Sequence, residues 1–256
     1  MSPAAVARRS ARAVVVGPGA RRALRDAAGA TAGGHVELAF GPGGYLRLGH
    51  HHVLLAPARS PLGPLSILVA GLARGDLVPG DPAAVAGGTL VVGPLRIELA
   101  GARDAPAPRS GALAQGWSVA LAAARDVVAP APPALASGIG ALAAGDLAGA
   151  VAQLAGRGDG LTPAGDDVLA GYAAWRWSCG QPVALPAQRC APLGRDYLRC
   201  AERGELPAPA AAVLDAIRDA DPPRAAGRAA RLADWGASSG AALLWGIAAG
   251  AAATEG

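Results

Sequence analysis

The pattern of hydrophobic and polar positions changes at about residue 104. Before it, short apolar runs rich in valine, isoleucine and leucine are separated by glycine and proline, which is typical of strands joined by tight turns. The expected strands are Ala13–Val16, His35–Phe40, Tyr45–Leu48, His52–Leu55, Leu65–Val69, Thr89–Val92 and Leu95–Leu99. So many short strands in succession predict a small barrel or sandwich.

Beyond a proline-rich stretch, apolar residues recur with the period of a helix, and prolines separate the periodic segments. The expected helices are 111–128, 134–144, 146–155, 165–178, 208–219, 223–235 and 240–253. We therefore predict an α+β protein: a β-rich, barrel- or sandwich-like N-terminal domain at 1–103, a linker at 104–110 and a helical domain at 111–256.

Composition narrows the class of protein. The chain has 256 residues, enough for one large domain or two small domains with a proper core. All 23 basic residues are arginine, the net charge is only +4 and aromatic residues make up 4%. A nucleic-acid binder would show a dense basic stripe with interleaved aromatics, so we expect no nucleic-acid partner.

Apolar runs and cysteines indicate the compartment. The first run, Ala13–Val16, is too short for a signal-peptide core, and the longest, Ala241–Ala253, falls short of the roughly 20 residues of a membrane span. The three cysteines are odd in number and widely spaced, which fits a reducing compartment. We expect a cytoplasmic protein with no membrane partner.

The most informative stretch is Gly156–Asp167, where glycines at alternate positions precede a helix start. We expect Thr162 to cap a helix whose first residue is Pro163, because a missing N–H costs nothing there. The amides of Gly158 and Gly160, together with the N–H groups of the helix start, would then form an anion-binding site.

Two carboxylates, Asp166 and Asp167, follow in the first turn. Neighbouring side chains on a helix point about 100° apart, so one can face the anion site while the other holds the loop. Gly165 lowers helix stability, which indicates that another group comes close to the backbone there. The alternative is an ordinary capped helix start with two solvated carboxylates.

A second helix start, Ser238–Gly240, resembles the first. Aligning Gly165 with Gly240 places Gly171 opposite Gly246, so both helices have small residues along one face. We predict that they pack closely, with both N-termini at one pocket to which Ser238 and Ser239 supply hydroxyl groups. The alternative is a pair of ordinary core helices in an alanine-rich protein.

The run Gly158-x-Gly160-Leu161-Thr162-Pro163-x-Gly165-Asp166-Asp167, with Ser238-Ser239-Gly240, resembles the bacterial family of oxamate carbamoyltransferase AllH-like subunits, formerly a domain of unknown function. The resemblance implies a subunit of a hetero-oligomeric transferase of allantoin (purine) degradation. That enzyme interconverts oxalurate plus phosphate with oxamate plus carbamoyl phosphate. An anion-binding loop suits such substrates, because phosphate and carboxylate groups favour helix N-termini.

The chain departs from the family pattern at three positions. The family usually has a serine where this chain has Ala164, and a histidine and an aspartate where it has Ala237 and Ala242. A hydroxyl, an imidazole and a carboxylate are therefore missing, which indicates a different substrate or little activity.

Our leading hypothesis is a carbamoyltransferase subunit that binds a small anionic metabolite such as phosphate, carbamoyl phosphate, oxamate or oxalurate. Asp166 or Asp167 would bind the amide of a carbamoyl group or hold Mg²⁺. We favour the amide and expect no cofactor, because Mg²⁺ generally needs phosphate or a second carboxylate. The candidate catalytic residues are Asp166 and Asp167, and the candidate substrate-binding residues are Gly158, Gly160, Leu161, Thr162, Gly165, Ser238, Ser239 and Gly240.

The alternative function is a non-catalytic scaffold or metabolite-sensing subunit of a hetero-oligomeric complex. The missing histidine and aspartate favour it. Under either hypothesis the partners would be other carbamoyltransferase subunits.

A run of histidines and a row of arginines could each be a binding site or ordinary surface. In a strand, only His50 and His52 of the triple histidine share a face, and we find no nearby cysteine or carboxylate to complete a site, so we expect partly exposed imidazoles and no metal. Arg224, Arg228 and Arg231 line one helix face, which is either solvated or docks an acidic partner.

Overall fold

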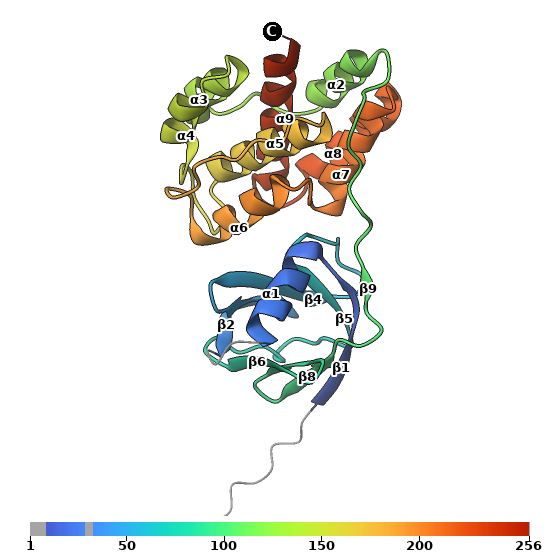
Figure 1. Cartoon of the computed structure of the whole chain (residues 1–256), viewed down its shortest axis with the longest axis vertical. Coiled ribbons are helices and arrows are strands. Elements are labelled where there is room, and N and C mark those ends of the chain that lie inside the picture. Colours follow the sequence, from blue (N-terminus) through green and yellow to red (C-terminus); the bar gives the residue numbers. More distant parts are fainter. Residues whose placement is uncertain (1–8, 29–32, 256) are drawn as a thin grey trace, which may run out of the picture. The chain divides into compact units, whose positions relative to one another are not determined.

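A computed structural model of the protein describes residues 9–28 and 33–255. The first eight residues of the predicted N-terminal domain therefore lie outside the described residues. The chain forms two compact units, Met1–Pro106 and Ala107–Gly256. The first is rich in strands and the second is helical, which confirms the predicted α+β class with a β-rich N-terminal barrel (Figure 1).

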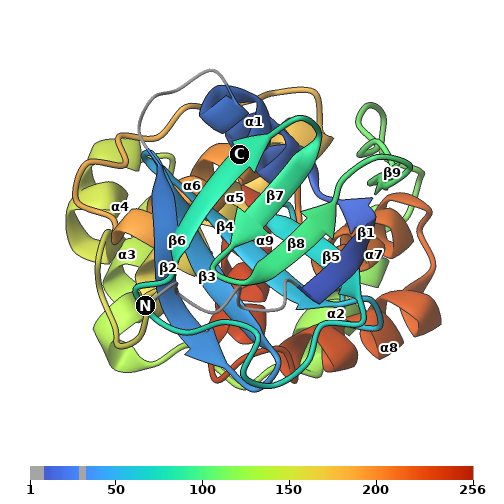
Figure 2. The ribbon, with the colours of Figure 1, turned by 90° about the horizontal axis from the view of Figure 1, so that it is seen from below.

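The N-terminal unit is a closed sheet. Its strands are β1 (Arg9–Val16), β2 (Gly34–Phe40), β3 (Gly43–Leu48), β4 (His51–Pro57), β5 (Ser66–Ala70), β6 (Pro82–Ala86), β7 (Thr89–Val92), β8 (Leu95–Glu98) and β9 (Arg103–Asp104). They are ordered β5-β4-β3-β2-β6-β7-β8-β1-β9, and pairing of β1 with β5 closes the barrel. Figure 2 shows β2, β6, β7, β8 and β1 following one another across the sheet.

Alternation along the strands fills the barrel. Leu46 and Leu48 of β3, and Val53 and Leu55 of β4, are buried in one core because side chains on a strand alternate between its two faces. β3 pairs with β4 so that Leu48 lies opposite His51, which leaves Gly49 and His50 as the turn. Sequence analysis missed β6, whose residues are mostly small, and the two-residue β9.

The described residues of this unit contain one helix, α1 (Pro18–Ala28). It follows β1 directly and buries Ala20, Ala23 and Leu24, while its polar residues face outward. It packs against β4 and β6. Asp104, which the sequence places in the linker, ends β9 and accepts a hydrogen bond from Arg21 of α1.

The C-terminal unit consists of helices with short connections. They are α2 (Trp117–Asp126), α3 (Pro133–Ala143), α4 (Leu147–Leu154), α5 (Ala164–Ser178), α6 (Pro192–Ala201), α7 (Ala208–Arg218), α8 (Pro222–Ala233) and α9 (Ser239–Glu255). All but α6 fall within or close to a predicted range. Helices α5 and α9 lie at the centre of this unit, and the others surround them (Figure 1).

The central position of α5 explains its composition. Every residue from Gly165 to Trp175 is buried, so this part of the helix is enclosed on all sides rather than along one stripe. Its two buried aspartates are therefore exceptional and need partners. No helix in the described ranges combines the length and the apolar character that crossing a bilayer requires.

Candidate functional site

Helices α5 and α9 pack closely because glycines allow their backbones to touch. A Cβ at Gly171 would overlap the carbonyl oxygen of Leu243, and a Cβ at Gly246 would overlap that of Val168. Val168 and Leu243 are equivalent positions when Gly171 is aligned with Gly246, so the contact is reciprocal. This confirms the prediction that the two helices pack through small residues.

The first glycines of the two helices also have matching roles. Gly165 admits the carbonyl oxygen of Leu154, at the end of α4, and Gly240 admits that of Leu232, near the end of α8. The close approach expected at Gly165 is therefore confirmed, and the group that approaches is protein backbone. The Gly165 amide donates to the Arg157 carbonyl oxygen at 2.8 Å, so it already has an acceptor within the loop.

The two helix starts meet at their hydroxyl groups. Thr162 Oγ1 and Ser239 Oγ are 3.3 Å apart, which confirms that both N-termini lie together. The expected capping role of Thr162 is wrong. Pro163 is the N-cap, because its extended ψ of 141° keeps it out of the helix, and no side chain caps the first turn.

Asp166 holds the loop to the rest of the unit. Its side chain, in a residue only 1% exposed, accepts a hydrogen bond from the Gly156 amide at 2.7 Å and from the Ala191 amide at 2.8 Å. Burial and the neighbouring Asp166 carboxylate raise the pKa of the Cys190 thiol to about 12. Asp166 is thus committed to internal contacts between the loop and the start of α6.

Asp167 is also buried, but its carboxyl group is not fully hydrogen-bonded. The residue is 6% exposed, and its Oδ2 atom is buried without a hydrogen-bond partner in the described chain. Burial raises the pKa of Asp167 to about 7, although the hydroxyls of Ser239 and Thr162 lower it and the charge of Asp166 adds to the rise. Asp167 can therefore exchange a proton near neutral pH, which is typical of functional carboxyl groups.

The glycine-rich loop passes over the start of α5. Gly156, Gly158 and Gly160 have φ values of 73°, 111° and 90°, which side-chain-bearing residues rarely adopt. A Cβ at Gly158 would lie 3.0 Å from the Ala164 nitrogen, so the loop approaches the first amide of the helix. Residues 156–161 are exposed, and Leu161 is 52% exposed.

Other candidate residues lie nearby with internal roles. The Ser238 carbonyl oxygen accepts from the Ala242 amide at 3.0 Å, and the Gly240 amide donates to the Trp235 carbonyl oxygen at 3.0 Å. Ala242 is fully buried in the helical core, and Ala237 is exposed. Sequence reasoning missed the contribution of Cys190 and Ala191, which lie in a segment where no helix was expected.

A separate groove of about 620 Å³ lies in the same unit, lined by residues of α2, α3, α9 and the segment between α2 and α3. Trp245 lies at this groove and donates its indole N–H to the Ala129 carbonyl oxygen at 3.0 Å. None of the residues lining it belongs to the glycine-rich loop. This groove is therefore distinct from the site at the helix starts.

The structure corrects the reading of the triple histidine. His50 lies in the turn and not in a strand, and the buried His52 contacts Arg47 and Glu37. A carboxylate does lie nearby, because α1 brings Asp26 to 2.9 Å from His51. On the other candidate surface, Arg224 pairs with Asp219 at 3.3 Å.

Fold and geometry together define a class: a helical unit in which a protonatable carboxyl and two hydroxyl groups meet where two helices start. The sequence profile of the family described as oxamate carbamoyltransferase subunit AllH matches residues 154–251. This segment runs from the last residue of α4 into α9 and contains the whole candidate site. The resemblance is thus confirmed over this segment. No curated protein and no solved structure matches the chain.

Proposed function

We propose that the chain is a subunit of a carbamoyltransferase-type enzyme and binds a small anionic metabolite at the starts of α5 and α9. The proposed reaction converts oxalurate and phosphate into oxamate and carbamoyl phosphate, a step of allantoin degradation. The family match supports the class of enzyme. The observation that carries the binding site is the buried, unpartnered Asp167 Oδ2 beside two hydroxyl groups.

Asp167 recognises the carbamoyl half of the ligand. A carbamoyl group presents N–H donors and a carbonyl acceptor on the same carbon. Ionised Asp167 accepts from the N–H group in a charge-assisted hydrogen bond, and protonated Asp167 donates to the carbonyl oxygen. With the pKa of Asp167 raised to about 7, both forms exist at neutral pH, so the same carboxyl can accept from the N–H group or donate to the carbonyl oxygen.

The hydroxyls of Thr162 and Ser239 recognise the anionic half. Both lie at helix starts, where the partial positive charge favours an anion by about 0.3–1 kcal/mol per helix. The amides of Gly158 and Gly160 add further donors from the loop. Gly165 and Gly240 contribute by letting the backbones approach, because their amides already donate to Arg157 and Trp235.

The binding test compares two aspartates of the same region by calorimetric titration of the full chain with oxamate, carbamoyl phosphate and inorganic phosphate. We expect Asp167→Asn to weaken binding at least tenfold, about 1.4 kcal/mol. Asp159→Asn, which changes an exposed carboxylate of the loop, should leave binding unchanged. Equal affinity in Asp167→Asn and wild type would refute the proposed site.

Other carbamoyltransferase subunits are the proposed partners, and the arginine face of α8 is the proposed surface for them. Arg228 and Arg231 continue this face beyond Arg224, which already pairs with Asp219. Reversing the charge of all three arginines should abolish co-purification with companion subunits. Unchanged co-purification would leave the face as solvated surface.

A non-catalytic scaffold or sensor remains the second candidate function. Ala237 and Ala242 supply only methyl groups where the resembling family has a histidine and an aspartate. Assays of carbamoyl phosphate turnover, by the chain alone and with its companion subunits, separate the two functions. Turnover that depends on Asp167 supports the catalytic subunit, whereas binding of oxamate or phosphate with turnover unaffected by Asp167→Asn supports the sensor.

A further inference from the structure

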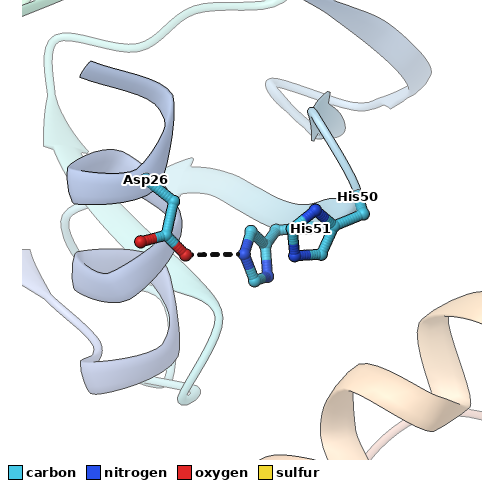
Figure 3. Close-up of side chains that lie close together, drawn as sticks. All are labelled: Asp26, His50 and His51. Atoms are coloured by element: carbon cyan, nitrogen blue, oxygen red, sulfur yellow. Dashed lines mark hydrogen bonds and ion pairs between the residues drawn. The ribbon is translucent and has the colours of Figure 1, made fainter. Parts of the chain in front are cut away.

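The N-terminal unit brings together three side chains that can act as metal ligands. Asp26 lies on α1, His50 lies in the turn between β3 and β4, and His51 begins β4. One ligand atom from each lies within 4.8 Å of the other two. Figure 3 shows the Asp26 carboxylate directed at the His51 ring, with the His50 ring next to it.

The donor set is one that first-row divalent cations prefer. Imidazole nitrogens and a carboxylate oxygen bind Zn²⁺ at about 2.0–2.2 Å, which places ligand atoms about 3–3.5 Å from one another. His51 Nε2 and Asp26 Oδ2 are already 2.9 Å apart. The remaining adjustment falls on His50, which is exposed, follows Gly49 in the turn and contacts the His51 ring, so its ring can turn without displacing a buried side chain.

A simple ion pair between Asp26 and His51 accounts for only two of the three groups. The His50 and His51 rings have centroids 4.0 Å apart and are tilted by 41°. Imidazole nitrogens on rings this close together can bind the same cation. His52, the third histidine, is buried on Arg47 and Glu37, so its ring is committed elsewhere.

We propose that Asp26, His50 and His51 form a three-ligand site for Zn²⁺ or a similar first-row divalent cation. The ion joins α1 to the β3–β4 turn and reinforces the link that the Asp26–His51 pair already makes between α1 and the start of β4. Three protein ligands leave a fourth position of a tetrahedral ion for water or for a small anion. This proposal is independent of the carbamoyltransferase proposal, because its residues belong to a different unit.

The test is equilibrium binding of Zn²⁺ to the full, untagged chain, with competition by a chelator of known affinity. We expect one ion per chain, and a loss of affinity on the order of 100-fold in His51→Ala and in Asp26→Asn, at least as large as the loss of a supporting contact. His35→Ala is the matched control, because His35 is an exposed histidine of the same unit outside the cluster. It should bind like wild type.

His50→Ala keeps the test valid if His51→Ala misfolds, because His50 is exposed. Zn²⁺ should raise the thermal stability of wild type and of His35→Ala, and should not raise that of His50→Ala or Asp26→Asn. Co²⁺ in place of Zn²⁺ should give visible absorption typical of nitrogen and oxygen ligands in wild type and His35→Ala, and not in His50→Ala, His51→Ala or Asp26→Asn. Failure of wild type to bind one ion, or equal binding by His50→Ala, would overturn the site.

Discussion

The first turn of α5 carries two buried carboxyl groups, Asp166 and Asp167, that differ in their hydrogen bonds. On one side, Asp166 accepts two backbone hydrogen bonds and links the loop to α6. On the other, Asp167 is almost as buried, lacks a partner for Oδ2 and faces two hydroxyl groups. The comparison teaches that burial alone does not identify a functional carboxyl: the state of its hydrogen bonds does.

The difference between the two sides arises from which elements face them. The Asp166 side faces loop amides and the start of α6, which offer N–H donors. The Asp167 side faces Thr162 and the start of α9, which offer hydroxyls. Replacing Asp166 should therefore lower the free energy of unfolding, whereas replacing Asp167 with asparagine should raise it relative to wild type as pH increases.

The largest expected effect is on the Asp166 side. Asp166→Ala leaves the Gly156 and Ala191 amides without their carboxylate acceptor, and each of these part-buried hydrogen bonds to a charged group contributes about 1.5–3 kcal/mol, so we expect a loss of about 4 kcal/mol in the free energy of unfolding. Urea denaturation measures it. Asp159→Ala, an exposed loop control, should change stability by about 0.5 kcal/mol or less. Similar small losses in both variants would contradict the assigned role.

Next in size is the pH dependence due to Asp167. Its folded pKa of about 7 lies above the ordinary value of 3.8, so the folded state holds a proton that the unfolded state releases. The stability that this bound proton contributes is complete below about pH 4 and is lost as pH rises through about 7, in total about 4 kcal/mol at 1.36 kcal/mol per unit.

Asp167→Asn removes this dependence. Between about pH 4 and pH 8, the difference in unfolding free energy between variant and wild type should shift in favour of the variant by about 4 kcal/mol. Denaturation at a series of pH values measures it, and Asp159→Asn should follow the wild-type curve. Parallel curves for Asp167→Asn and wild type would show that the carboxyl is ionised throughout.

A smaller effect is expected from the contact between α5 and α9, which positions the Asp167 side and not the Asp166 side. Gly246→Ala places a methyl group on the Val168 carbonyl, and such overpacking costs about 1–3 kcal/mol. It moves α9, and with it Ser239, while sparing the contacts of Asp166. Gly227→Ala in α8 is the control: its Cβ meets open space, so it should stabilise by about 0.5–1 kcal/mol. Denaturation of both variants measures this, and a stabilising Gly246→Ala would contradict the close helix contact.

The smallest expected effect concerns the hydroxyl beside Asp167. Ser239→Ala removes a group that lowers the pKa of Asp167, so that pKa should rise above about 7, with a change in stability of about 1 kcal/mol or less. NMR titration of the Asp167 carboxyl measures it. Ser238→Ala removes a neighbouring hydroxyl that does not act on this pKa and should leave it unchanged. Equal shifts in the two variants would refute the specific contact.

Local patterns in the sequence were sufficient to predict the α+β class, most of the elements and the meeting of the two helix starts. The glycine spacing of α5 and α9 predicts their contact because a missing side chain is itself the cause of close packing. The same local reasoning misassigned the cap, because it could not foresee that Thr162 would turn toward Ser239. It also left open which aspartate holds the loop.

The remaining errors concern partners distant in sequence. Ala191 donates one of the two backbone hydrogen bonds to Asp166, and it lies 25 positions away, just before the unpredicted helix α6. Asp26 reaches His51 only because α1 folds back over β4. Such pairs depend on tertiary packing, which periodicity along the chain does not contain.

The separation of Thr162 from Ser239 by 77 positions has a consequence for biosynthesis. On the ribosome, the histidine turn can reach α1 as soon as the N-terminal unit has emerged, because domains fold as units during translation. The hydroxyl pair cannot form until the final helix has been made. A prematurely terminated chain lacking α9 would therefore retain the proposed cation site and have no complete metabolite site.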